Sequence, residues 1–276
     1  MGAMHAHELE WIHRLQDALR SPWMDRIFLG WNYIDSLGFL LLVLVLVWYL
    51  VDRRIGIRLA YILMLSSVVN VFLKYFFGLP RPCQIDPSVS VICSAAPGFP
   101  SGAAQTAIIL AVVIILECRK RLYWYLGLVF AFLLCFSRIY LGLHYFTDIL
   151  GGLASGGLLL LIYWKVFPIM EKQWKIAILL FPLLLLIIGQ SSALFFFWSS
   201  IGIAIGLLLN EKFKIDTKGS WRKRSLQALT VLIGLTLFAL MFYKGNSSLK
   251  WLFGLGAGLW LSHLGAWSVQ KLTRSR

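Results

Sequence analysis

The stretch FLLLVLVLVWYLV, from Phe39 to Val51, has no polar face when it is drawn as a helix. The run IAILLFPLLLLIIG, from Ile176 to Gly189, is of the same kind. A helix that is apolar all round belongs in lipid or in a large protein core. Because 59% of the 276 residues are hydrophobic and only 14% are charged, a soluble domain is excluded. We therefore predict an all-α, polytopic integral membrane protein.

The hydrophobic pattern predicts about nine transmembrane helices. Two of them, the third and the sixth, are shorter than the roughly 20 residues that cross a bilayer, so either can be re-entrant. The predicted spans lie at about 27–51, 57–78, 100–117, 122–137, 146–165, 175–190, 192–210, 226–243 and 249–269.

The net charge of +14 arises from basic residues at alternate ends of successive spans. That alternation indicates membrane topology and argues against nucleic acid as a partner. One set of loops, together with the C-terminal tail, carries 18 Lys and Arg residues, whereas the opposite side carries 8. Because cytoplasmic loops are enriched in Lys and Arg, we predict the N-terminus outside and the C-terminus in the cytoplasm.

Residues 1–26 precede the first span and lack the apolar core of a cleavable signal peptide. Trp11, Ile12, Leu15 and Leu19 recur at helical spacing, which predicts a short helix lying in the membrane interface. The opening Met-Gly-Ala-Met resembles a remnant of cloning, and we exclude it from reasoning about the fold.

The four cysteines fall into two pairs. Cys118 and Cys135 lie at or within spans, where we expect small hydrophobic side chains. Cys83 and Cys93 bracket a short loop on the predicted outer side, where either a disulfide or two free thiols are consistent with the sequence. Two cysteines without a neighbouring histidine make a poor zinc site.

Ionisable residues gather at the outer ends of the second to fifth predicted spans. Lys74 and Arg81 flank the turn-forming sequence YFFGLP, so the two cations can face one another and hold an anion. The sequence GFPSG, from Gly98 to Gly102, directly precedes the third span, and the free N–H groups of a helix N-terminus bind phosphate well. Snorkelling of the cations to lipid headgroups is the alternative for this group.

His144 and Asp148 are four residues apart and therefore share one helical face. The carboxylate can accept a hydrogen bond from one imidazole nitrogen, which leaves the other nitrogen unprotonated, as a nucleophile or base requires. Arg138 can reach the same place only if the backbone bends at Gly142. A purely structural His–Asp pair is the alternative.

Three motifs in this order resemble the signatures of the type 2 phosphatidic acid phosphatase superfamily. They are K-x6-R-P (Lys74, Arg81, Pro82), P-S-G (Pro100, Ser101, Gly102) and S-R-x5-H-x3-D (Ser137, Arg138, His144, Asp148). The resemblance implies a helical membrane core, no metal cofactor, His144 as a nucleophile that forms a phosphohistidine, and Asp148 as its orienting partner. The phosphate-holding residues that it implies are Lys74, Arg81, Ser101, Gly102 and Arg138.

Ala103 departs from the resemblance, because the family reads P-S-G-H and this chain reads P-S-G-A. The missing histidine is the family's general acid, which protonates the leaving oxygen. We favour an introduced His→Ala substitution over a natural pseudoenzyme, and we expect an inactive or weakly active protein in either case. Ala103 thus marks the third catalytic position beside His144 and Asp148.

These observations predict a phosphatase core over residues 27–165 and an extension of about four spans over 166–276. The expected activity is hydrolysis of a lipid phosphate or pyrophosphate at the outer membrane face. That face is periplasmic in a bacterial inner membrane or lumenal in the ER. Undecaprenyl pyrophosphate, phosphatidic acid and sphingoid-base phosphates all fit. The alternatives are a lipid phosphotransferase and a non-enzymatic lipid-binding or transport protein. Nine spans also resemble glucose-6-phosphatase and sphingosine-1-phosphate phosphatases in architecture. The chain offers no signal for its oligomeric state.

Overall fold

The computed structural model describes residues 3–118, 121–172, 191–213, 219–244 and 249–274. Regular structure within these ranges is helical throughout, which confirms the all-α prediction there. The chain divides into two compact units. Unit 1 comprises Met1–Phe39 and Val69–Trp164, and unit 2 comprises Leu40–Val68 and Lys165–Arg276.

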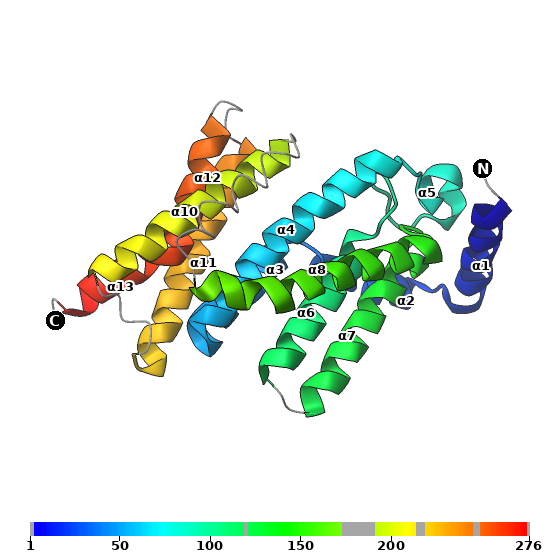
Figure 1. The fold of residues 1–276 in the computed structure, drawn as a ribbon. Coiled ribbons are helices and arrows are strands. Elements are labelled where there is room, and N and C mark those ends of the chain that lie inside the picture. The colour runs from blue at the N-terminus through cyan, green and yellow to red at the C-terminus, as the bar shows by residue number, and fades with distance from the viewer. Residues whose placement is uncertain (1–2, 119–120, 173–190, 214–218, 245–248, 275–276) are drawn as a thin grey trace. The chain divides into compact units, whose positions relative to one another are not determined.

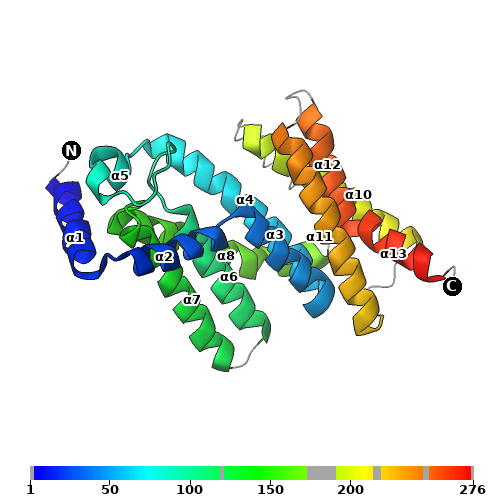
Figure 2. The ribbon, with the colours of Figure 1, turned by 180° about the vertical axis from the view of Figure 1, so that it is seen from behind.

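Unit 1 contains all the residues predicted to bind or attack phosphate. Its α6 and α7 run side by side in both views (Figures 1 and 2). A short irregular segment between α4 and α6 carries the two smallest helices, α5 and η2. The elements of this unit are α1 (Ala3–Leu19), α2 (Pro22–Ile34), the end of α4 (Arg53–Phe77), α5 (Pro82–Ile85), η2 (Pro87–Val89), α6 (Gly102–Cys118), α7 (Arg121–Tyr140) and the first part of α8 (Phe146–Lys172).

The predicted first span, 27–51, is not one continuous helix. Ser21 caps α2 by accepting a hydrogen bond from the Met24 amide at 3.2 Å, and Pro22 stands at the first helical position. Helix α2 ends at Ile34, and the chain restarts as Leu37–Val51 at an angle of 58°. The predicted span therefore contains a break at Asp35 and Ser36, the two polar residues between Ile34 and Leu37.

Unit 2 packs a polar group of side chains among its helices. Tyr49 donates a hydrogen bond to the carbonyl of Leu261 at 2.7 Å. His263 is buried, and its Nδ1 lies 2.8 Å from Oδ1 of Asn210. The elements of this unit are α3 (Leu37–Leu46, from Leu40 on), η1 (Val47–Val51), the start of α4, the end of α8, α10 (Ser191–Phe213), α11 (Trp221–Lys244), α12 (Lys250–Leu259), η4 (Trp260–Leu264) and α13 (Gly265–Arg274).

Four described helical segments are long and apolar enough to cross a membrane: Arg53–Ile85, Arg121–Tyr140, Phe146–Val166 and Trp221–Phe242. The bent pair Pro22–Ile34 and Leu37–Val51 makes a fifth if it counts as one span. The apolar part of α6, Gly102–Val113, is short, as the sequence predicts for the third span. The predicted span 175–190 lies outside the described residues, so the total of nine stays a prediction.

Candidate active site

His144 lies in the tight connection between α7 and α8. Gly142 adopts a positive φ of 70°, a backbone conformation that glycine takes without strain. This turn lets the amides of Leu143 and His144 both donate to the carbonyl of Arg138, at 3.0 and 3.3 Å. The bend at Gly142 that the sequence requires is therefore present, and it brings His144 into the interior with only 4% of its surface exposed.

Asp148 holds the imidazole of His144 in one orientation. Nδ1 of His144 lies 3.1 Å from Oδ2 of Asp148, and the same oxygen accepts from the Tyr145 amide at 3.0 Å. Because an ionised carboxylate only accepts hydrogen bonds, Nδ1 carries the proton and Nε2 keeps its lone pair. Burial, and then the charges of Arg81, Lys74 and Arg138, lower the pKa of His144 well below its ordinary value. The imidazole is therefore neutral near pH 7, as a nucleophile must be.

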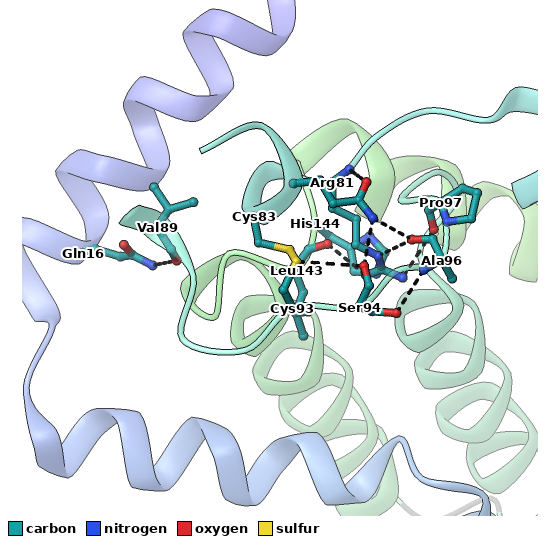
Figure 3. Close-up of a disulfide and its surroundings, with 11 residues drawn as sticks. Gln16, Arg81, Cys83, Val89, Cys93, Ser94, Ala96, Pro97, Leu143 and His144 are labelled. Atoms are coloured by element: carbon teal, nitrogen blue, oxygen red, sulfur yellow. Dashed lines mark hydrogen bonds between the residues drawn. A yellow bond between two sulfur atoms is a disulfide. The ribbon is translucent and has the colours of Figure 1, made fainter. Parts of the chain in front are cut away.

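Arg81 contacts the unprotonated face of His144. Its Nη1 lies 3.1 Å from Nε2 of His144 and donates to the carbonyl of Leu143 at 3.0 Å. Its Nε donates to the carbonyl of Ala96 at 2.7 Å (Figure 3). The guanidinium thus occupies the side from which a phosphate would approach His144.

Lys74 converges on the same loop from the end of α4. Its Nζ donates to the carbonyls of Pro97 and Gly98, both at 2.8 Å. Arg81 also reaches the Pro97 carbonyl, through Nη2 at 3.3 Å. The two cations that the sequence predicts to face one another are therefore joined through the carbonyls of one loop.

Gly98 and Ser101 bring the P-S-G motif against Asp148. A Cβ at Gly98 would lie 3.0 Å from Oδ2 of Asp148, so this close approach favours glycine. Ser101 is fully buried, its amide donates to the Asp148 carbonyl at 2.9 Å, and its hydroxyl accepts from the Ala104 amide at 3.4 Å. Ser101 therefore caps α6, and the first helical N–H groups, from Gly102 on, have no intrahelical partner.

Arg138 is 3% exposed and extends toward α2. Its Nη1 donates to Oδ1 of Asn32 at 2.5 Å, and its Nη2 forms an ion pair with Oδ2 of Asp35 at 3.7 Å. Its Nε and Nη2 have no hydrogen-bond partner among the described residues. The sequence alone did not place Asn32 or Asp35 in the site, although both are polar residues within a segment that otherwise reads as a membrane span.

The sequence comparisons agree with this geometry. A profile of the PAP2 superfamily matches residues 55–171, which include every predicted site residue. The putative undecaprenyl-diphosphatase YbjG of Escherichia coli K12 is 31% identical over 140 residues, covering 49% of this chain and 70% of that protein. The chain belongs to the PAP2 superfamily. The expected family is thus confirmed.

Other PAP2 relatives and one solved structure show how far the similarity extends. Phosphatidylglycerophosphatase B of Bacillus subtilis is 26% identical over 170 residues, covering 57% of this chain and 81% of the relative. The crystal structure of a PAP2-type phosphatidylglycerolphosphate phosphatase from Bacillus subtilis superposes with a TM-score of 0.51 at 25% identity, covering 62% of this chain and 88% of that one. Lipid A 4'-phosphatase of Porphyromonas gingivalis is 29% identical over 127 residues, covering 44% of this chain and 53% of that protein.

Ala103, the departure from the PAP2 pattern, is 2% exposed in the first turn of α6. It belongs to an apolar cluster with Ala107, Ala111, Ala131 and Leu134, against which Trp31 and Phe130 pack. A methyl group has no proton to deliver, so position 103 contributes no acid to this PAP2 site.

The Cys83–Cys93 pair, which the sequence left open, forms a disulfide with a Cα–Cα distance of 5.8 Å. It closes the loop that begins two residues after Arg81 (Figure 3). The Cys83 amide donates to the Gly142 carbonyl at 3.1 Å. The disulfide therefore closes the loop next to Arg81, and the Cys83 amide ties that loop to the turn that carries His144.

Helix α1 contacts the segment between His144 and Asp148, a role that the sequence of residues 1–26 did not indicate. Glu8 accepts from the Thr147 amide at 2.8 Å and from the Thr147 hydroxyl at 2.9 Å. The ring of His5 stacks on that of Tyr145 at 4.7 Å. The N-terminal helix thus braces the residues between His144 and Asp148. Trp11 is 70% exposed, whereas Ile12 is buried, and the membrane-interface placement of α1 stays a prediction.

Proposed function

We propose that this PAP2 protein is an integral membrane phosphatase that removes phosphate from a lipid phosphate or lipid pyrophosphate through a phosphohistidine at His144. The observation that carries the proposal is the buried imidazole whose Nδ1 is bonded to Asp148 and whose Nε2 faces Arg81. The relatives named above are a phosphatidylglycerophosphatase, a putative undecaprenyl-diphosphatase and a lipid A 4'-phosphatase, which supports a lipid phosphate as the substrate class.

In the proposed reaction, Nε2 of His144 attacks phosphorus as the bond from phosphorus to the lipid oxygen breaks. The leaving oxygen takes a proton and departs as the lipid alcohol or lipid monophosphate. Water then attacks the phosphohistidine, releasing inorganic phosphate and restoring the imidazole. Because charge develops on the phosphoryl oxygens, the barrier is lowered by fixed cations around them. Lys74, Arg81 and Arg138 fill that role.

Arg81 has to change partners when substrate binds. In the free protein its Nη1 donates to Nε2 of His144 at 3.1 Å, so the lone pair that must attack phosphorus is occupied. A phosphate oxygen placed beside the guanidinium offers a stronger, charged acceptor. Phosphate binding thus releases Nε2 and at the same time brings the cation onto the phosphoryl group.

A test of the function uses phosphate release from a panel of lipid phosphates and pyrophosphates, with an aryl phosphate as a reactive reference. His144→Ala abolishes release and the acid-labile phosphoprotein that forms with labelled substrate. His7→Ala is the matched control, because the same change is made at an exposed position outside the site. Phosphoprotein that persists in His144→Ala refutes the assigned nucleophile. Silence of the folded Ala103→His variant on the whole panel refutes the phosphatase.

A binding protein without turnover is the second candidate, favoured by Ala103. An acid of this kind contributes about 10²–10⁴ to rate, whereas ground-state binding of phosphate uses the cations and not the proton donor. Under this candidate, the protein binds vanadate or a lipid phosphate with the affinity of the Ala103→His variant and lacks turnover. The unmodified gene distinguishes the origins: a histidine codon at 103 refutes a natural pseudoenzyme.

The site is proposed to face the outside, which is the periplasm for a bacterial inner membrane and the lumen for the ER. The support is the distribution of 18 basic residues against 8. Single cysteines at Ser88 and Arg222, both exposed positions, report the two sides. An impermeant thiol reagent labels position 88 and spares position 222 in intact cells. Labelling of position 222 from outside overturns the orientation.

A further inference from the structure

One carboxylate beside the three site cations has no part in the mechanism above. Within the described residues, the acidic groups that interact electrostatically with both Lys74 and Arg81 are Asp148 and Asp35. Asp148 is occupied by Nδ1 of His144 and the Tyr145 amide. Asp35 remains, and its strongest attraction is to Arg138.

The break in the first span brings Asp35 to this place. Helix α2 ends at Ile34, and Asp35 is its C-terminal cap, with its own amide directed back to the Asn32 carbonyl at 3.3 Å. Its carboxylate lies 3.7 Å from Nη2 of Arg138, too far for a hydrogen bond but close enough for an ion pair. The carboxylate therefore faces the guanidinium without being locked to it.

The end of α2 is connected to position 103 through one apolar cluster. The apolar cluster that contains Ala103 is covered by Trp31, four residues before Asp35. In this chain the family's proton donor is absent, and the carboxyl group of α2 stands beside the site cations.

We propose that Asp35 exchanges the proton with the leaving oxygen, in the role that the histidine at position 103 performs elsewhere in the family. This inference rests on the proposed phosphatase function. The Asp35 carboxyl gives its proton to the lipid oxygen as the bond between phosphorus and that oxygen breaks and the bond from Nε2 of His144 to phosphorus forms. In the second step, the Asp35 carboxylate takes a proton from the attacking water while the nitrogen–phosphorus bond breaks. Asp35 is then ready for the next turnover.

Phosphate binding favours the protonated form of the Asp35 carboxyl group. In the free protein the carboxylate pairs with Arg138 on α7 at 3.7 Å and is attracted less strongly by Lys74 on α4 and Arg81 before α5. Bound phosphate neutralises those cations and places negative charge next to the carboxylate. A neighbouring like charge favours the protonated form of a carboxyl group. Asp35 therefore becomes a proton donor in the complex, where a donor is needed.

Asp35→Asn is the direct test, because the amide keeps the shape of the side chain and has no transferable acidic proton. Turnover of an alkyl or lipid phosphate falls by about 10²–10⁴, the usual contribution of a general acid. Turnover of an aryl phosphate falls far less, because its leaving oxygen needs little assistance. Binding of vanadate is retained. The alkyl rate of the parent also follows a pH profile with a limb that Asp35→Asn removes.

Three further variants separate a proton donor from a structural ion pair. Asp35→Glu retains measurable alkyl turnover, since it keeps a carboxyl group. Asp25→Asn, on the same helix, changes aryl and alkyl rates equally, because Asp25 accepts from the Tyr140 hydroxyl at 2.7 Å and lies outside the cation cluster. Ala103→His added to Asp35→Asn restores alkyl turnover, because a proton donor returns at the family's position.

Two outcomes overturn the inference. An equal loss for aryl and alkyl phosphates in Asp35→Asn, together with weaker vanadate binding, shows that Asp35 only positions Arg138. Unchanged alkyl turnover in Asp35→Asn shows that the proton comes from elsewhere. A parent chain that forms no phosphohistidine even from an aryl phosphate is a separate result, which refutes the proposed function itself.

Discussion

Gly142→Ala is expected to damage both the stability and the activity of the protein, because Gly142 shapes the turn that carries His144. The residue has a φ of 70°, and a Cβ added there would lie 2.3 Å from the carbonyl oxygen of Val89 and 3.0 Å from its carbonyl carbon. Two separate costs follow: the left-handed backbone of a residue with a side chain, and a steric clash with the main chain.

The two costs have different magnitudes. The left-handed conformation costs an L-residue about 1–2 kcal/mol. The clash adds to this because Val89 has little freedom to move: it is fully buried, packs with Ile12 and Tyr145, and its carbonyl accepts a hydrogen bond from Gln16 at 2.8 Å. The free energy of unfolding of Gly142→Ala should therefore fall by clearly more than about 2 kcal/mol.

Two other glycines of the same unit serve as matched controls. Gly78 has a φ of 60°, and a Cβ added there would have no atom within 4 Å, so Gly78→Ala measures the backbone cost alone, about 1–2 kcal/mol. Gly157 lies within α8 with equally open space and ordinary φ, so Gly157→Ala should leave stability unchanged or raise it by up to about 1 kcal/mol.

The assay is reversible unfolding in mixed detergent micelles, combined with turnover of an aryl phosphate. We expect Gly157→Ala to be the most stable of the three variants, Gly78→Ala to be less stable, and Gly142→Ala to be the least stable. Only Gly142→Ala should lose most of its turnover. Equal destabilisation by Gly78→Ala and Gly142→Ala would refute the steric part of the reasoning. Full activity in Gly142→Ala would show that the turn does not determine the position of His144.

Three further outcomes are expected. Replacing Cys83 and Cys93 together by serine lowers the free energy of unfolding by roughly 2–3 kcal/mol, because the disulfide closes a loop of sequence separation 10 in the unfolded chain. Equal stability of the parent protein with and without a reductant contradicts this prediction. Burial and neighbouring cations lower the pKa of His144, so its ring stays neutral as the pH falls through about 6.5, the ordinary pKa of histidine, and becomes protonated only at lower pH. In 15N NMR of labelled histidine, a titration midpoint at or above about 6.5 disproves the shift. Glu8→Gln weakens the hydrogen bonds between α1 and Thr147 and lowers the free energy of unfolding by about 1 kcal/mol, since charge-assisted hydrogen bonds are replaced by neutral ones. An unchanged free energy of unfolding shows that α1 does not stabilise this segment.

The helical membrane class and most of the site were predictable from sequence because they depend on short-range patterns. An apolar run such as Phe39–Val51 dictates a helix in lipid whatever surrounds it, since its backbone must bond internally. The spacing of four between His144 and Asp148 places both on one face, and the structure joins them at 3.1 Å. The motif order around Lys74 and Arg81 likewise indicated the cation pair, because a single turn separates the two residues.

The rest was decided by contacts between residues far apart in the chain. Arg138 turns to Asn32, 106 positions away, and Glu8 reaches Thr147, 139 positions away. No local pattern determines such pairs, because they arise from how helices pack and where one of them breaks. Asp35 illustrates the point: the sequence shows a lone acid in an apolar run, and only the 58° break after Ile34 brings its carboxylate to Arg138. The residue types of the candidate site thus follow from the sequence alone, whereas the partners of Arg138 and Glu8 follow from the tertiary structure, because a buried polar group is bonded wherever packing provides a partner.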